Sequence, residues 1–254
     1  MSIWLFAGRV RSRIEYGLLF ICGFVRFPFI MASEQNRFRA VFDRLLEAFG
    51  PQGWWPAETP FETMVGAILT QHTAWTNVEQ ALGRLRAAGA LDARILLDMP
   101  DGKLETLIRP AGTFRVKARR LKAFLAYFMG RYGGDVARMK GVSGRRLREE
   151  LLAVNGIGPE TADCILLYAL EKPSFVVDAY TRRVFGRLGL MDGALEYHEV
   201  QRRFVAALPG EVGLYNEYHA LIVALGKRVC LPKPRCGQCM LKAICATGGR
   251  DGQV

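Results

Sequence analysis

The sequence predicts an all-α protein. Apolar residues recur at intervals of three and four over ten stretches of the chain, which is the spacing of a helix with one buried face. No persuasive stretch alternates apolar and polar residues as a half-buried strand does. Turn-forming segments such as Gly50–Gly53, Arg109–Gly112 and Asn155–Gly158 separate the stretches, and short connections of this kind suit helices that pack side by side.

These separators mark where four of the expected helices end. Gly50–Gly53 ends the first, Arg109–Gly112 the fourth, Asn155–Gly158 the sixth and Glu171-Lys172-Pro173 the seventh. The ten stretches span Phe38–Phe49, Phe61–Leu69, Val78–Leu85, Ala90–Leu97, Lys117–Phe128, Arg145–Leu152, Thr161–Leu170, Thr181–Leu188, Tyr197–Ala207 and Tyr215–Val229.

Two of the separators, near Gly53 and near Glu171-Lys172-Pro173, are the expected seams between two helical subdomains. We expect residues 53–170 to form a helical-barrel subdomain that ends in a helix, a glycine hairpin and a second helix. Residues 31–52 and 171–254 form the second helical subdomain, to which a cysteine loop at 230–245 is attached.

Residues 1–30 differ in composition from the rest of the chain. Arginines precede a short apolar run, Tyr16–Val25, which is too short to span a bilayer and has no clear small-residue cleavage site. We expect that translation starts at Met31 and that residues 1–30 are not a functional leader, because Met31 opens an ordinary amphipathic helix, Asn36–Phe49.

Composition and charge narrow the class of protein. Half of the 254 residues are hydrophobic, so the chain can bury one large core or two smaller ones without disulfides. The net charge of +11 indicates a polyanionic partner, with nucleic acid first and an acidic membrane surface second.

Four cysteines stand close together as Cys230-x5-Cys236-x2-Cys239-x5-Cys245. Four thiolates in a tight loop hold one Zn²⁺ ion or a [4Fe–4S] cluster. The alternative, a disulfide framework, is typical of secreted chains below about 100 residues that lack a core. The spacing indicates a metal and leaves iron and zinc open.

The segment Leu151–Asp163 contains the glycine hairpin. Gly156 and Gly158 permit positive φ and leave their backbone N–H groups open to an anion, and Pro159 suits the first helical position. The start of the helix around Thr161 then points its free N–H groups at whatever lies in front of the hairpin, and a DNA phosphate is one candidate. Two-glycine turns also join helices in proteins that bind nothing there.

The order of these parts resembles the helix-hairpin-helix DNA glycosylases of the endonuclease III superfamily. The parts are the hairpin Val154–Ala162, then Phe175-Val-Val-Asp178 with Thr181–Phe185, then the four cysteines, and the match runs from about Phe38 to Cys245. The resemblance implies a [4Fe–4S] cluster rather than zinc, double-stranded DNA with a damaged base as partner, and a monomer in the cytoplasm at the nucleoid, without membrane association. The first cysteine interval has five residues where the family usually has six.

In this family an Asp about twenty residues after the hairpin is catalytic, and Asp178 occupies that place. A fixed carboxylate beside C1′ stabilises the positive charge that develops on the deoxyribose and orients the attacking water. The alternative is that Asp178 only caps the helix that starts at Ala179, and both roles are compatible.

Bifunctional members of the family carry a lysine just before the Thr-Ala of the hairpin helix, where this chain has Glu160. A carboxylate cannot form the imine that leads to strand cleavage. The resemblance therefore implies a monofunctional glycosylase, with Glu160 as a second carboxylate in the catalytic site. A plainer interpretation is an acid in the first turn of a helix, which the helix dipole favours.

Three tryptophans, Trp54, Trp55 and Trp75, bracket the segment Phe61–Thr73. A flipped base needs aromatic surfaces, and an alkylated, cationic purine gains cation–π attraction from Trp, although most tryptophans are core residues. The double Trp resembles the 3-methyladenine DNA glycosylase branch of the superfamily. Gln71 matches the glutamine that fills the gap left by the extruded nucleotide.

Further DNA contacts follow from the same resemblance. Phe114, in Gly112-Thr113-Phe114, matches the loop that wedges into the duplex, or it is a core residue. Lys117, Lys227 and Arg235 are phosphate-contact candidates, or ordinary surface charges.

The predicted function is excision of alkylated purines from DNA by a monofunctional glycosylase. One alternative is an endonuclease III-like glycosylase for oxidised pyrimidines, uracil or mismatched thymine. The other is a non-catalytic iron–sulfur protein that binds DNA.

Overall fold

The computed structural model describes residues 26–54 and 57–249, with side chains from Glu34 onward. Within these ranges the chain is built from helices and turns, with no strand. The all-α prediction is confirmed. None of the described helices is long and apolar enough to cross a membrane.

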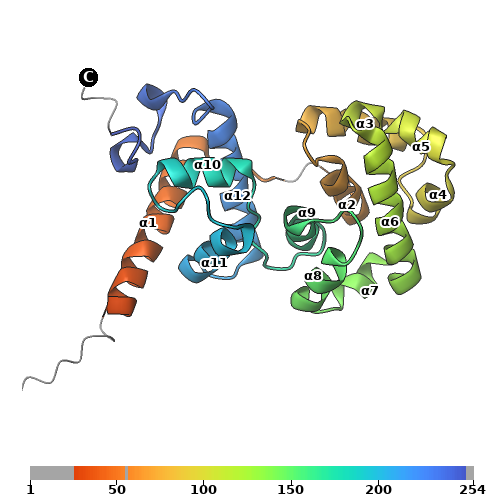
Figure 1. Cartoon of the computed structure of the whole chain (residues 1–254), viewed down its shortest axis with the longest axis horizontal. Helices are drawn as coiled ribbons and strands as arrows, with labels where there is room; N and C mark the ends of the chain where they lie inside the picture. Colours follow the sequence, from red (N-terminus) through yellow and green to blue (C-terminus); the bar gives the residue numbers. More distant parts are fainter. Residues whose placement is uncertain (1–25, 55–56, 250–254) are drawn as a thin grey trace, which may run out of the picture.

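Helices α2 to α9 form one half of the molecule, and α1 packs with α10 to α12 in the other half (Figure 1). The first half contains α2 (Pro60–Leu69), α3 (Trp75–Ala87), α4 (Ala93–Asp98), α5 (Asp101–Leu107), α6 (Phe114–Tyr132), α7 (Val136–Lys140), α8 (Gly144–Leu152) and α9 (Pro159–Cys164), with the 3₁₀ turn η1 (Arg109–Ala111) and the π-helical segment η2 (Ile165–Ala169) that follows α9. The second half contains α1 (Arg26–Phe49), α10 (Ala179–Arg187), α11 (Tyr197–Ala207) and α12 (Val212–Arg228), followed by η3 (Cys236–Gln238) and η4 (Lys242–Ile244).

The core of the first half is organised around α6. Leu121, Phe124 and Phe128 of this helix are fully buried because they recur on one face at helical spacing. Phe128 stacks on Phe61 of α2, with 6.0 Å between ring centroids. Helix α2 starts where Thr59 accepts a hydrogen bond from the Glu62 N–H and Pro60 takes the first helical position.

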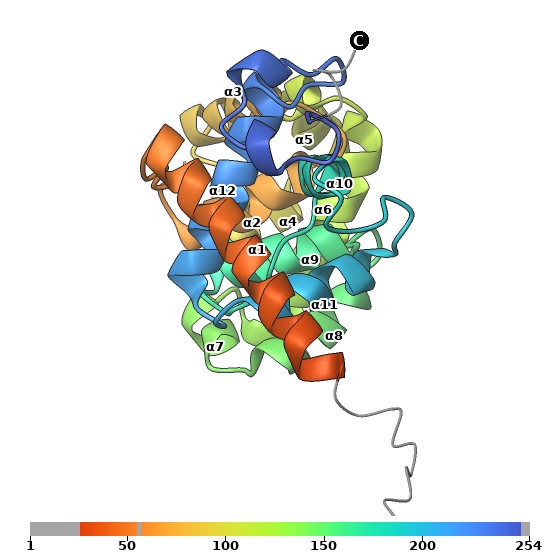
Figure 2. The same cartoon turned by 90° about the vertical axis from the view of Figure 1, so that its left-hand side faces the viewer.

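The core of the second half is aromatic. Phe175 stacks on Phe204 at 3.9 Å between ring centroids, and Phe38 of α1 packs edge-on against Phe204. The Tyr218 hydroxyl of α12 donates a hydrogen bond of 2.7 Å to the carbonyl of Phe38. In the view of Figure 2, α1 runs across α11 and α12, which it contacts along its length.

A buried carboxylate connects the hairpin to the second half. Asp163 of α9 is 0% exposed and accepts two hydrogen bonds, at 2.8 and 3.0 Å, from the guanidinium of Arg148. Ser174 and Gln201 donate to the same carboxylate at 2.6 and 2.9 Å. Because burial of an unpaired charge is costly, this network fixes the path of the chain from the hairpin to α10.

All ten predicted helices are present, with differences at some ends. The structure adds α5 and α7, which are too short to show a clear apolar period. Helix α4 starts later than predicted because Asp92 accepts hydrogen bonds from the N–H groups of Arg94 and Ile95. Helix α1 starts at Arg26, before the predicted Asn36, and residues 1–25 of the expected leader lie outside the described residues.

Candidate active site

A cleft of about 1360 Å³ opens between the two halves of the molecule. Its lining comes from the loops around α2 and α3, the hairpin before α9, the start of α10 and one face of α12. Nine of the predicted residues lie along it: Trp54, Gln71, Trp75, Gly156, Gly158, Glu160, Thr161, Asp178 and Lys227.

Asp178 caps helix α10 and also faces the cleft. Its Oδ1 accepts hydrogen bonds from the backbone N–H of Thr181, at 2.7 Å, and from the Thr181 hydroxyl, at 2.8 Å. The side chain is 13% exposed. Burial by itself raises the pKa of Asp178, but His219 and the hydrogen bonds from Thr181 outweigh it and hold the pKa below its usual value. Asp178 is therefore a charged carboxylate at neutral pH, with Oδ2 left for other contacts.

Glu160 lies in the first turn of α9 and is exposed within the cleft. Desolvation by the surrounding protein and the negative charge of Asp178 raise the pKa of Glu160 to about 7, against weaker opposing effects of His219 and Arg182. The cleft thus contains one carboxyl group that stays ionised and one that titrates near neutral pH.

His219 of α12 is a residue of this site that the sequence reasoning missed. Its Nε2 lies 3.6 Å from Oδ2 of Asp178, and its Nδ1 lies 2.5 Å from the Tyr168 hydroxyl. The signal was a polar residue inside the apolar stretch Tyr215–Val229, and the side chain is only 4% exposed.

Two of the three predicted tryptophans are described, and they occupy different walls. Trp54 stacks on His219 at 5.8 Å between ring centroids. Trp75, at the start of α3, donates a hydrogen bond to Glu79 at 2.9 Å, and its ring lies against Gly66 of α2. Trp55 lies outside the described residues.

Gln71 is held against the hairpin rather than projecting freely. Its Nε2 donates to the carbonyl of Gly156 at 2.9 Å and to the Thr161 hydroxyl at 3.0 Å, while Arg120 donates to its Oε1 at 2.5 Å. Gly156 has φ of 84°, and a Cβ there would lie 2.2 Å from Arg120 Cγ. Of the two glycines that permit positive φ, Gly156 adopts it and Gly158, with φ of −89°, does not.

The predicted phosphate contact at Lys117 is wrong. Lys117 is 1% exposed, and its Nζ donates hydrogen bonds to the carbonyls of Leu69, at 2.9 Å, and Ala111, at 2.5 Å. It fixes the ends of α2 and η1 and cannot reach a DNA backbone. Phe114, at the start of α6, is half-buried against the first core, with the Arg109 guanidinium 4.9 Å from its ring centroid.

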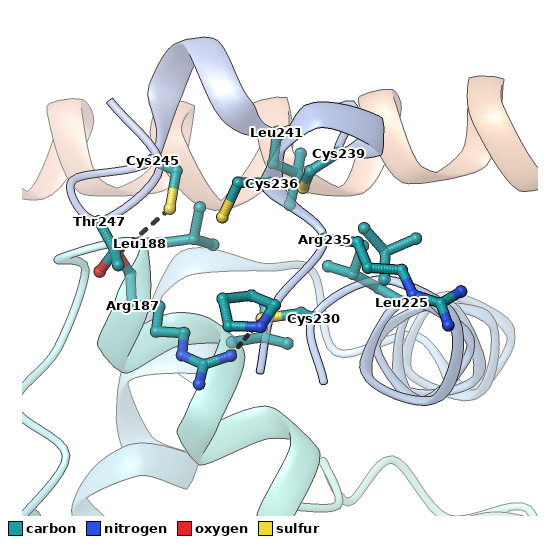
Figure 3. A pocket seen from close by; sticks show the side chains of 13 residues that line it. Arg187, Leu188, Leu225, Cys230, Arg235, Cys236, Cys239, Leu241, Cys245 and Thr247 are labelled. Carbon is teal, nitrogen blue, oxygen red and sulfur yellow. Dashed lines mark hydrogen bonds between the residues drawn. The ribbon is translucent and has the colours of Figure 1, made fainter. Parts of the chain in front are cut away.

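The four cysteines of the C-terminal loop line a separate hollow beside α10 and the end of α12 (Figure 3). Arg187 of α10 donates to Cys230 Sγ at 3.4 Å, and the Gly248 N–H donates to Cys245 Sγ at 3.3 Å. Arg235 is exposed at the same hollow. Among the described residues, no three His, Cys, Asp or Glu side chains gather closely enough to hold a single metal ion.

Comparisons with known proteins identify the family. Residues 65–209 match the model of the HhH-GPD superfamily base excision DNA repair protein. A protein of Methanocaldococcus jannaschii named "Putative DNA repair glycosylase MJ1434" is 44% identical over 84% of this chain and 98% of its own length.

Solved structures show the same fold. A non-covalent endonuclease III–DNA complex superposes with a TM-score of 0.75 at 24% identity, over 87% of this chain and 99% of the other. The H. pylori 3-methyladenine DNA glycosylase bound to 1,N6-ethenoadenine gives 0.65 at 28% identity, over 77% of this chain and 97% of the other. This chain belongs to the HhH-GPD superfamily of base excision DNA repair proteins and is a DNA glycosylase.

Proposed function

We propose that this glycosylase hydrolyses the N-glycosidic bond of alkylated purines in double-stranded DNA and does not go on to cleave the strand. We further propose that it acts as a monomer on nucleoid DNA in the cytoplasm. The observation that carries the proposal is the pair of carboxyl groups, Asp178 and Glu160, in a cleft that also presents Trp54.

Asp178 is suited to the chemical step because it stays ionised in a protected place. As the bond from C1′ to the purine nitrogen breaks, its electron pair leaves with the base and positive charge develops on the sugar. The Asp178 carboxylate stabilises that charge, and a water oxygen then bonds to C1′ while its proton passes to the carboxylate. The cap on Oδ1 holds the group in place for this work.

Glu160 supports a monofunctional enzyme, since a carboxylate cannot attack C1′ to form an imine. Among the described lining residues of the cleft, Lys227 is the lysine that could offer an amine instead. Borohydride trapping on DNA with an abasic site tests whether the native protein forms an imine and whether Lys227 supplies the amine. We expect no trapped adduct for the native protein or Lys227→Gln, and an adduct for Glu160→Lys. An adduct with the native protein refutes the monofunctional proposal.

The preference for a cationic purine is supported by charge and by aromatic surface. In its ionised form, which predominates above about pH 7, Glu160 attracts a positively charged base. A cationic ring stacked on Trp54 also gains cation–π energy of about 0.5–2 kcal/mol. The similar H. pylori enzyme is named a 3-methyladenine DNA glycosylase, and its structure holds ethenoadenine.

An excision panel tests the substrate class. Duplexes that carry 3-methyladenine, 7-methylguanine, ethenoadenine, uracil or thymine glycol are incubated with the native protein and with Asp178→Asn. We expect release of the alkylated purines and none with the variant, which should still bind DNA. Preferential release of thymine glycol or uracil refutes the substrate class, and unchanged release by Asp178→Asn refutes the catalytic assignment.

We also propose that the four cysteines hold a [4Fe–4S] cluster. The four cysteines line one hollow, and the resemblance to cluster-binding members of the family favours four irons over one zinc ion. Two N–H···S contacts, from Arg187 and Gly248, suit thiolate ligands. When bound, the cluster would order the loop that presents Arg235. Broad visible absorption with matching iron and sulfide content tests this, and a colourless protein with one zinc refutes it.

A further inference from the structure

The environment of the Asp178 carboxylate is asymmetric. Thr181 occupies Oδ1 with two hydrogen bonds, whereas Oδ2 faces His219 Nε2 at 3.6 Å. That distance is longer than a hydrogen bond. His219 Nε2 is buried and has no hydrogen-bond partner among the described residues. A buried polar nitrogen without a partner costs about 1–3 kcal/mol, so its position beside the carboxylate calls for an explanation.

The Tyr168 hydroxyl fixes which nitrogen of His219 carries the proton. It lies 2.5 Å from Nδ1, and burial, with smaller effects of the nearby Cys164 and Asp178, raises the pKa of Tyr168 well above its usual value, so the hydroxyl stays protonated. A donating hydroxyl makes Nδ1 the acceptor and leaves the proton on Nε2. The opposite tautomer would turn a lone pair toward the Asp178 carboxylate.

The imidazole is also held from its face and from its own helix. Trp54 stacks on His219 with 28° between the ring planes and meets Tyr168 edge-on. Two residues earlier on α12, Glu217 accepts hydrogen bonds from the N–H groups of Gln52, at 2.6 Å, and Gly53, at 3.3 Å. Helix α12 thus anchors the segment that carries Trp54 and supports the imidazole at the same time.

From this geometry we propose that His219 is a positioning residue for Asp178, and that its Nε2–H closes onto Oδ2 when the damaged nucleotide fills the cleft. Hydrogen bonds of catalytic groups commonly tighten in the substrate complex. With Thr181 on one oxygen and His219 on the other, the carboxylate plane is fixed toward C1′. His219 does not touch the substrate in this role, and Tyr168 supports it by fixing the tautomer. The inference rests on the proposed catalytic role of Asp178.

Three variants separate positioning from packing. His219→Gln can place an amide N–H where Nε2 stands, His219→Asn is too short to do so, and His219→Leu removes the donor at similar bulk. His198→Leu, at an exposed histidine on α11, is the matched control. The readouts are the single-turnover rate constant on the duplex that the native protein cleaves fastest, the dissociation constant for the same duplex, and the urea unfolding midpoint.

We expect His219→Leu and His219→Asn to lower the rate constant by about 10- to 100-fold and to change DNA affinity by less than about threefold. This loss of rate is smaller than the loss on removing a donor that touches the transition state. His219→Gln should recover most of that loss, and Tyr168→Phe should show a smaller one. If Leu does not fold, the comparison of Gln with Asn decides. Equal rates for Gln and Asn, or a native rate for Leu, overturn the proposal.

Nitrogen-15 NMR of the imidazoles gives a readout that does not depend on activity. The chain has three histidines, so the His219 signals are assigned by their loss in His219→Gln. We expect the Nε2–H tautomer in the native protein and a mixture in Tyr168→Phe. An Nδ1–H tautomer in the native protein overturns the inference whatever the rates. An active Asp178→Asn variant would refute the catalytic role of Asp178, and therefore the proposed function. The tautomer of His219 measured by NMR does not depend on that result.

Discussion

Replacing Glu160 by Gln should make the protein more stable at neutral and alkaline pH and leave its stability unchanged in acid. Desolvation in the cleft, together with the charge of the neighbouring Asp178, raises the pKa of this carboxyl group from 4.5 to about 7. A group whose pKa is raised on folding binds its proton more tightly in the folded protein. Ionisation of Glu160 therefore destabilises the fold progressively as pH rises from about 4.5 to 7.

The size of the effect follows from the same two values. A shift from 4.5 to about 7 corresponds to about 3 kcal/mol at full strength. Because Glu160 is exposed and solvent screens its charge, we expect about 1 kcal/mol to remain. Gln keeps the shape and removes the charge, so Glu160→Gln should gain about this much over the native protein at pH 8.

Urea unfolding of both proteins at pH 4, 6 and 8 measures this difference. The native protein and the variant should coincide at pH 4 and diverge between pH 5 and 7, with the variant more stable above pH 7. Glu149→Gln is the control, since Glu149 is exposed on α8 and forms only a surface ion pair with Arg145. A difference that does not change with pH, or one with the opposite sign, refutes the raised pKa of Glu160.

Three further predictions concern residues outside the chemical step. Lys117→Met leaves two buried carbonyl groups without a donor and should cost about 1–3 kcal/mol of unfolding free energy. Burial, with a smaller effect of a neighbouring arginine, lowers the pKa of Lys117 to about 8, so the folded protein releases this proton at a lower pH than the unfolded chain does. The native protein should therefore gain stability relative to the variant between about pH 8 and 10. A difference that stays constant over this range would contradict the prediction. Arg148→Met leaves the Asp163 carboxylate buried without its cation and should lower the free energy of unfolding, measured with urea, by about 3–5 kcal/mol. The control Arg145→Met removes only a surface ion pair and should lower it by less than about 0.5 kcal/mol. Equal effects of the two changes would contradict the argument. Cys239→Ala should abolish the visible absorption of the purified protein, and a native spectrum would exclude this residue as a ligand.

The parts of the site that the sequence predicted well are those with a local cause. Asp178 follows an apolar stretch and precedes a helix, so its position at the start of α10 is readable from neighbours in the chain. The hairpin is likewise local, because Gly156 and Pro159 define the turn by their own backbone preferences.

The missed residues depend on contacts between distant segments. Lys117 looks like any basic residue on a helix, although it stands four residues before Leu121 and so shares the buried face of α6. His219 acquires its role only when α12 packs beside α10 and η2, which no local pattern in the sequence states. Periodicity predicts that a face is buried but not which distant side chains meet it.

The hydrogen bond between Tyr218 and Phe38 joins residues 180 positions apart, and it has a consequence for synthesis of the protein. Helix α1 leaves the ribosome before the other described helices, and the helices that cover Phe38, Val41 and Leu45 are translated after it. At about 5–20 residues per second, its apolar face stays uncovered for roughly 10–40 s. An apolar helix face exposed during synthesis is prone to aggregation, which is the physical reason that chaperones protect such segments. A chain that stalls before α12 leaves this core without one of its covering helices, so the half that holds Asp178 cannot close.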